Sequence, residues 1–520
     1  MNRSLNVLVA ALSIAALAGC GGATQDSSTS LNPESKDLVH SVKAVGTVPA
    51  DYQAVTQALY VAYFGRPADP AGEANYEAAL LAAEAPTDVF GLSSAYATNP
   101  KIQALIDSFG KSTESQALYG TGTTTQFVTT IYANLLSRQP QQAGLSFWSD
   151  AISNGTLTQG DAALSIMAGA LGNTSSQGQL DGQLVQNRLV VAQMFTDTVT
   201  AKSAVNAYTG AGAAANARAM LASVTASTVT SAYQTQVTNS VQYAIETQAA
   251  IDTINAMRAS VGMPPLIKVG SLAVAAQNHA TYMADNMTAG LVETAGLPGY
   301  TAADTSTRLL NTGYGSMNGN DEDAYETAPT AGSIVGVGVQ QGRIWVDAPV
   351  LRNAFLWTGG SDIGVGLALN ASGTLEFGDV LLGWKTASET ESTYPASFVA
   401  YYPAPGATEV PLHAGLDASA FPSYSLSDFA TKTGYPISVS VGQGVAIQAG
   451  SLTVTANGST SALPMTVFSA ANNSELNSTY MAFVGTAPFA PNTTYNVVFT
   501  GTTSNGPLTK SWSFTTGNGN

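Results

Sequence analysis

Apolar residues recur at two different spacings along the chain. Between residues 50 and 239 they fall three and four positions apart in an Ala-rich sequence, which predicts amphipathic helices. From Tyr402 onward, short stretches such as Ile437 to Val441 and Tyr495 to Phe499 alternate apolar and polar residues, with Gly, Asn, Ser and Pro between them. This second spacing predicts strands joined by turns. The chain therefore has a helical part, a β-rich part and a segment of different character between them.

The helical part contains an internal repeat with an offset of 72 residues. Each copy has an aromatic residue, then an arginine before a turn, then a second aromatic residue. These are Tyr60, Arg66 and Tyr76 in the first copy and Tyr132, Arg138 and Trp148 in the second. Helical spacing before each arginine and the turn after it predict two related helical hairpins. We expect the arginines to bind loop carbonyls or a carboxylate and Tyr76 and Trp148 to fill the core.

This repeat resembles an uncharacterised helical domain of bacterial surface and secreted proteins. That resemblance implies a location and no chemistry. We expect the helical repeat domain to span residues 50–239.

The N-terminus has the pattern of a targeting segment. Arg3 supplies a short positive region, and the apolar run from Leu5 to Ala16 is too brief to span a bilayer. The four residues from Leu17 to Cys20 resemble a bacterial lipobox. This resemblance implies that residues 1–19 are a signal peptide and that Cys20, the only cysteine of the chain, is acylated, for example with palmitate.

Residues 20–49 are rich in Ser, Thr, Gly and Asp and poor in aromatic residues, which predicts a disordered tether. Gly21 follows the cysteine, where an aspartate would favour retention at the inner membrane in the lipoproteins that this segment resembles. We therefore expect a lipid-anchored protein of the cell envelope, at the outer membrane, on its periplasmic or its extracellular side.

The most distinctive motif lies between the helical and β-rich parts, from Trp345 to Arg352. Its sequence, Trp-Val-Asp-Ala-Pro-Val-Leu-Arg, resembles the Trp-x-x-Ser-Pro-Gly-His-Arg segment of the CAP superfamily of cysteine-rich secretory, antigen 5 and pathogenesis-related proteins. Other matches follow the family order, at Asn255, Arg258, His279, Pro298 to Tyr300, Arg308 and Ile363 to Gly366. The resemblance covers residues 245–385 and implies an α-β-α sandwich.

In many members of this family two histidines and two acidic residues line a cleft and bind a divalent metal. Here Leu351 stands in place of the second histidine, and the first falls at Leu291 or Glu293, depending on the register. The nearest carboxylates to the family's Gly-Glu-Asn motif are those of Glu322 and its neighbours. The candidate cleft therefore consists of Glu293, Asp321, Glu322, Leu351 and Arg352.

We predict no metal and no cofactor in this cleft. Glu293 and Glu322 are weak candidates, because carboxylates alone can hold Ca²⁺ if they converge with Asp321 and Asp323. His279, the only histidine of this segment, is expected to be structural. Trp345 and Arg352 are expected to support the helix that follows the motif.

Composition and charge exclude several function classes. Charged residues make up 10% of the chain, and the formal net charge is −16 without a basic cluster, so nucleic acid and anionic membrane surfaces are poor partners. Nucleophile-elbow, phosphate-loop and zinc-helix motifs are absent from the sequence. The run Gly336-Val337-Gly338 lacks the third glycine of a dinucleotide motif and predicts a strand or loop. With three histidines in total, the sequence does not favour an enzyme.

Residues 394–517 have a further resemblance, to bacterial immunoglobulin-like modules. Tyr495 and Trp512 are the aromatic residues that would pack between the two sheets of such a β-sandwich. We expect this module to act as a spacer or stalk, with contact to carbohydrate or a surface as the alternative.

The sequence thus predicts a multidomain protein with an all-α helical repeat domain, an α-β-α sandwich of the CAP type and a C-terminal immunoglobulin-like β-sandwich. We expect a non-catalytic binding module for a lipid, glycan or protein, attached to the membrane through Cys20. One alternative is a metal-assisted hydrolase, which requires Glu293 and Glu322 to face one cleft. The other is a purely structural surface or matrix protein, which requires no apolar cleft.

Overall fold

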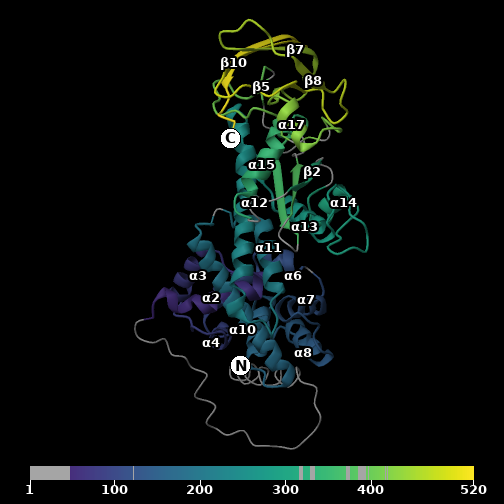
Figure 1. Ribbon diagram of the computed structural model, residues 1–520. Coiled ribbons are helices and arrows are strands. Elements are labelled where there is room, and N and C mark those ends of the chain that lie inside the picture. The colour runs from purple at the N-terminus through teal and green to yellow at the C-terminus, as the bar shows by residue number, and fades with distance from the viewer. Residues whose placement is uncertain are drawn as a thin grey trace, which may run out of the picture. The chain divides into compact units, whose positions relative to one another are not determined.

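The computed structural model describes residues 47–519 except 121, 206, 316–319, 328–333, 371–374, 384–393, 396, 416 and 418–419. The predicted signal peptide, Cys20 and most of the predicted tether lie outside the described residues. The chain forms two compact units (Figure 1). One comprises residues up to Thr209 together with Ala213–Val241, and the other comprises Gly210–Gly212 and Gln242–Asn520.

The first unit is helical, as the sequence predicts. Its elements are η2 (Pro49–Tyr52), α2 (Gln53–Phe64), α3 (Pro70–Ala82), α4 (Val89–Tyr96), α5 (Pro100–Gly110), α6 (Thr113–Tyr119), α7 (Thr124–Leu136), α8 (Gln142–Ser153), α9 (Gln159–Gly172), α10 (Ser176–Ala201), α11 (Gly210–Ala222) and η3 (Thr230–Ala232). Asp69 and Thr123 accept hydrogen bonds at helix starts from Gly72 N and Gln126 N. Pro70 and Pro100 open helices, where no amide hydrogen is needed.

The two predicted hairpins are confirmed as α2–α3 and α7–α8. Arg66 binds Glu114 through Nε and Nη2, at 2.7 and 2.9 Å, and Arg138 binds Asp181 in the same two-pronged way. Each arginine also donates to a turn carbonyl, so both expected kinds of partner are present. Trp148 is buried and donates to the Tyr132 hydroxyl.

The second unit begins with a four-stranded sheet between two helical layers, as the CAP resemblance implies. The elements are α12 (Gln234–Ser260), β1 (Ile267–Lys268), α13 (Gly270–Asn286), α14 (Thr305–Asn311), β2 (Asn320–Thr327), α15 (Val337–Asp347), α16 (Arg352–Leu356), β3 (Asp362–Leu369) and β4 (Glu376–Gly383). The strand order is β1-β3-β4-β2, with β1 parallel to β3 and the other pairs antiparallel.

Alternation along the strands places one helical layer on each face of this sheet. Val365 and Val380 pack with residues of α12 and α15, whereas Leu381 packs with Leu272 and other residues of α13. Gly364 allows α13 to lie close, since a Cβ there would stand 2.3 Å from the Leu272 carbonyl carbon. The two glycines of the Ile363 to Gly366 segment are thus explained by a close helix–strand contact.

The run Gly336-Val337-Gly338 is not a strand or loop, so that prediction was wrong. Gly336 is the N-cap of α15 with φ +88°, and the helix starts at Val337. The Glu246 carboxylate accepts hydrogen bonds from Gly336 N and Gly338 N at 3.0 and 2.8 Å. A side chain on α12 therefore supplies the helix cap, which local sequence does not reveal.

The C-terminal part of the second unit is β-rich. It contains β5 (Val399–Tyr402), α17 (Leu426–Lys432), β6 (Ile437–Val441), β7 (Ile447–Ala456), β8 (Met465–Ser469), β9 (Tyr480–Gly485), β10 (Thr494–Thr503) and β11 (Gly506–Thr515). Two antiparallel sheets, ordered β11-β10-β7 and β5-β6-β9-β8, enclose a core that includes Phe483, Tyr495 and Trp512. The predicted strand at Ile437 to Val441 coincides with β6, and Tyr495 to Phe499 lies within β10.

The sequence separates residues 245–385 from residues 394–517, but the structure gathers both into one compact unit. They share an apolar cluster to which Trp345 and Phe355 contribute from the first segment and Phe429 and Tyr480 from the second. Burial of this shared cluster couples the two segments.

Candidate functional site

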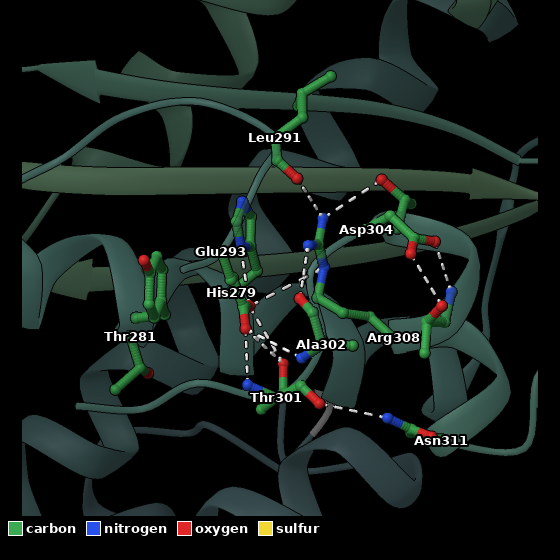
Figure 2. Close-up of polar contacts among 12 residues, drawn as sticks. His279, Thr281, Leu291, Glu293, Thr301, Ala302, Asp304, Arg308 and Asn311 are labelled. Atoms are coloured by element: carbon green, nitrogen blue, oxygen red, sulfur yellow. Dashed lines mark hydrogen bonds and ion pairs between the residues drawn. The ribbon is translucent and has the colours of Figure 1, made fainter. Parts of the chain in front are cut away.

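Glu293 lies in the loop between α13 and α14, and its side chain is fully buried in a polar network (Figure 2). Oε2 accepts hydrogen bonds from Thr301 N at 2.6 Å and Ala302 N at 3.1 Å. The Thr301 hydroxyl donates to the same carboxylate, and His279 Nδ1 lies 3.0 Å from Oε1. Glu293, at one of the two positions where the family's first histidine could fall, thus fixes the backbone of this loop by hydrogen bonds.

His279 links this carboxylate to helix α13. Its Nε2 lies 2.8 Å from the carbonyl oxygen of Gly290, which can only accept a hydrogen bond. Its Nδ1 faces Glu293, which also accepts when it is ionised. The ring therefore bridges the Gly290 carbonyl oxygen and the Glu293 carboxylate, with one nitrogen facing each. The expected structural role of His279 agrees with these contacts.

Arg308 on α14 completes the network. It is buried, its Nη2 donates to the Leu291 carbonyl oxygen at 3.0 Å, and its Nε lies 4.0 Å from Glu293 Oε1. Burial by itself would raise the pKa of Glu293, but hydrogen bonds from Thr301, His279 and Ala302 outweigh it and hold this pKa below the usual value. Glu293 is therefore ionised and fully engaged, and its role in this network is structural.

The segment around this buried network carries several exposed apolar side chains. Met287, Leu291, Val292, Leu297 and Tyr300 are all exposed, and we call this set the apolar loop. Leu291 turns its carbonyl oxygen toward Arg308 and its side chain away from the network (Figure 2). The network thus fixes a backbone that presents apolar groups to solvent.

Leu351 and Arg352 lie in a different setting, at the start of α16. Leu351 is the N-cap residue of this helix and packs on the shared apolar cluster, and it offers no metal ligand. Arg352 is completely buried and donates to the carbonyl oxygens of Val346 and Pro436 and to Ser438 Oγ. The expected support of the neighbouring helix is only part of its role, because it also binds strand β6.

Residues of the C-terminal segment form hydrogen bonds with several residues of the Trp345 to Arg352 motif. Asp417 accepts a hydrogen bond from Val350 N at 2.7 Å, the Tyr480 hydroxyl donates to the Pro349 carbonyl oxygen, and the Tyr435 hydroxyl donates to Asp347. Burial raises the pKa of Asp347, an effect that Tyr435 and Arg352 partly offset. No local signal marks Asp417 or Tyr480 in the sequence, because their partners lie more than sixty positions away.

Asp321 and Glu322 lie on β2, in register with Leu382 and Leu381 of β4. Their side chains, and with them the convergence with Glu293 that the hydrolase alternative requires, lie outside the described part of the structure. Among the described residues, no three His, Cys, Asp or Glu side chains gather in a group that could hold a metal ion. The engaged oxygens of Glu293 and the apolar Leu351 do not fit the family's metal.

Glu376 on β4 is a second unusual carboxyl group, which sequence reasoning missed. It is 1% exposed, and neither carboxyl oxygen has a hydrogen-bond partner. Burial, followed by the charge of Glu246, raises its pKa to about 8. Gln341 on α15 is also buried with both amide atoms unpartnered. A neutral, protonated Glu376 at pH 7 is the state that this environment favours.

The helical unit contains a cavity of about 180 Å³ between equivalent ends of the two hairpins. Its lining includes Gly65 and Ser137, which are 72 positions apart, together with Arg188 and Arg218. Arg188 donates to backbone carbonyls at the ends of α7 and α11, and burial lowers its pKa to about 10. Its positive charge lies at the negative C-terminal ends of these two helices and stabilises them, so the role of Arg188 is structural.

Comparison with known families supports two of the resemblances. Residues 251–377 match the family model described as the cysteine-rich secretory protein family, so the chain contains a CAP domain. Residues 106–170 match a domain of unknown function, DUF4214, which covers the second hairpin. A search of curated proteins finds none that matches this chain. None of the described helices is both long and apolar enough to cross a membrane.

Proposed function

We propose that this chain is a lipid-anchored protein of the cell envelope whose CAP domain is a non-catalytic binding module. The apolar loop is its contact surface. The observation that carries this proposal is the pairing of a fully engaged, buried Glu293 with exposed apolar side chains on the same loop. The carboxylate of Glu293, the candidate catalytic group, instead holds the backbone of the apolar loop in place.

The anchor and the location rest on the sequence. The lipobox-like segment ending at Cys20 supports acylation, and Gly21 supports the outer membrane. The immunoglobulin-like resemblance of residues 394–517 is supported by two antiparallel sheets around one core. The C-terminal segment contacts the Trp345 to Arg352 motif closely. These contacts favour a role in stabilising the CAP domain rather than that of a free stalk.

The hydrolase alternative is less well supported by the same contacts. It needs Glu293 to act on a metal or a water together with Glu322, yet Glu293 accepts from two backbone amides and pairs with His279. Releasing one oxygen would leave a buried donor without a partner. The structural-matrix alternative gives no reason for an exposed apolar surface on a fixed loop.

The proposed surface is tested with the neutral apolar dye Nile red, whose fluorescence rises on apolar surfaces. We compare the chain from Ala23 to Asn520 with Val292→Asp/Leu297→Asp and with the control Val229→Asp/Val498→Asp, which charges two exposed valines elsewhere. We expect the loop pair to lower the dye signal severalfold and the control pair to leave it unchanged. Equal signals from both variants would show that the loop is not the binding surface.

A further inference from the structure

Between its two exposed flanking carboxylates, Asp285 and Asp304, the apolar loop presents no charged side chain to solvent. Between Asn286 and Ala303 the only charged residue is Glu293, and it is buried. The large apolar side chains are led by Val292 at 70% and Met287 at 54% exposure, and the exposed polar side chains among them, Thr288 and Thr294, are uncharged. Concentrated apolar exposure of this kind marks an interaction site in a soluble domain.

The loop is also held rigid before any partner arrives. Thr301 N and Ala302 N are bound by Glu293, the Leu291 carbonyl by Arg308 and the Gly290 carbonyl by His279. Contact therefore requires little further ordering of the backbone, which keeps the entropic cost of binding low. A fixed loop can use its apolar area for association.

Charge on the rest of the chain narrows the choice of partner. With a formal net charge of −16, the protein is repelled by anionic surfaces and attracts basic ones to its exposed carboxylates, whereas the loop between Asp285 and Asp304 exposes no charge of its own. An uncharged apolar phase fits the loop best. Leu, Val and Met side chains with a Tyr beside them suit the boundary between lipid headgroups and acyl chains.

We propose that the apolar loop docks onto a bilayer of zwitterionic lipid, with Val292 and Leu297 inserted between the headgroups. This proposal rests on the function proposed above, because a lipid-anchored chain meets the bilayer at a high effective concentration. The loop then provides a second contact with lipid that does not use the acyl chain.

The test is sedimentation with phosphatidylcholine vesicles. The chain from Ala23 to Asn520 lacks Cys20, so any binding comes from the protein surface. We expect it to sediment with the vesicles equally well in low and high salt, since apolar contacts are not screened. Val292→Asp/Leu297→Asp should lower the partition coefficient by about tenfold or more, because each charge opposes insertion. Val229→Asp/Val498→Asp should leave the coefficient unchanged.

Several outcomes would overturn the docking proposal. These are a wild-type chain that stays in the supernatant, a loop variant that binds as well as the wild type, and equal losses in the loop and control variants. Loop-dependent self-association without vesicles would assign the surface to a second copy of the chain. If the loop binds Nile red but not vesicles, the binding-module proposal stands and the lipid proposal fails. Circular dichroism checks that each variant is folded, and the milder pair Val292→Ser/Leu297→Ser should give an intermediate loss.

Discussion

His279 Nδ1 and Glu293 Oε1 lie 3.0 Å apart, with both side chains completely buried. In the CAP resemblance, the position of Glu293 is one of two where a metal-binding histidine could fall. Here it pairs with a histidine of helix α13, and the pair ties down the loop that follows. One of the two positions where the family's first histidine could fall thus holds the backbone of the apolar loop in place in this chain.

Replacement of Glu293 by Gln should loosen the apolar loop. The amide has one acceptor oxygen and places its NH₂ group near His279 or Arg308, so the buried network loses about 3 kcal/mol. Hydrogen exchange at Thr301 N and Ala302 N should speed up, because both amides donate to Glu293. Glu475→Gln, at an exposed carboxylate, is the matched control. Unchanged protection of both amides would argue against the structural role of Glu293.

The same network predicts a response to acid. The pKa of Glu293 is lowered in the folded chain, so its contribution to stability is present above the unfolded value of about 4.3 and is lost as the pH falls through the folded value. Exchange protection at Thr301 N should therefore persist at pH 5 and disappear at lower pH. Loss of protection already between pH 7 and 6 would point to a different group.

Glu376 should give the opposite pH dependence. Its pKa of about 8 means that the folded state keeps a proton that the unfolded state releases above about 4.3. Stability therefore falls as the pH rises from about 4.3 to about 8, with a penalty on the order of 3 kcal/mol at pH 7. Glu376→Gln should remove this slope and raise the urea midpoint at pH 8. A variant with the wild-type slope would show that Glu376 is not the group responsible.

Arg352 should couple the CAP domain to the C-terminal strands. Arg352→Met leaves the Pro436 carbonyl and Ser438 without their buried donor, which should cost about 3 kcal/mol. The matched control is Arg343→Met, an exposed arginine on α15. Urea unfolding followed by tryptophan fluorescence should show a lower midpoint for Arg352→Met only. Equal midpoints for both variants would contradict the coupling.

Much of the fold could be predicted from sequence because its signals are local. The 72-residue repeat, the strand at Ile437 to Val441 and the CAP motifs each depend on residues close together in the chain. The start of α15 could not be predicted, because its cap comes from Glu246, ninety positions earlier. Glycines at Gly336 and Gly338 weaken the helical pattern, and only the tertiary contact restores it.

The candidate site was predicted only as a set of positions. Glu293 was named as a candidate cleft residue, but its buried partners Thr301 and Arg308 give it a structural role. Leu351 and Arg352 are packed against residues of the C-terminal segment. No sequence pattern marks Asp417, which binds the neighbouring Val350, as part of this region. Contacts that local sequence patterns do not reveal decided the roles of Glu293, Leu351 and Arg352.

The most direct test of a non-catalytic CAP domain is calorimetric titration of the chain from Ala23 to Asn520 with Zn²⁺, Ca²⁺ and Mg²⁺. Glu322→Ala alone and Glu293→Ala/Glu322→Ala serve as variants. Our account predicts no heat beyond dilution for any of the three ions, because Glu293 is fully engaged and Leu351 provides no ligand. Tight binding of one ion, lost in both variants, would contradict it and restore the metal-assisted hydrolase.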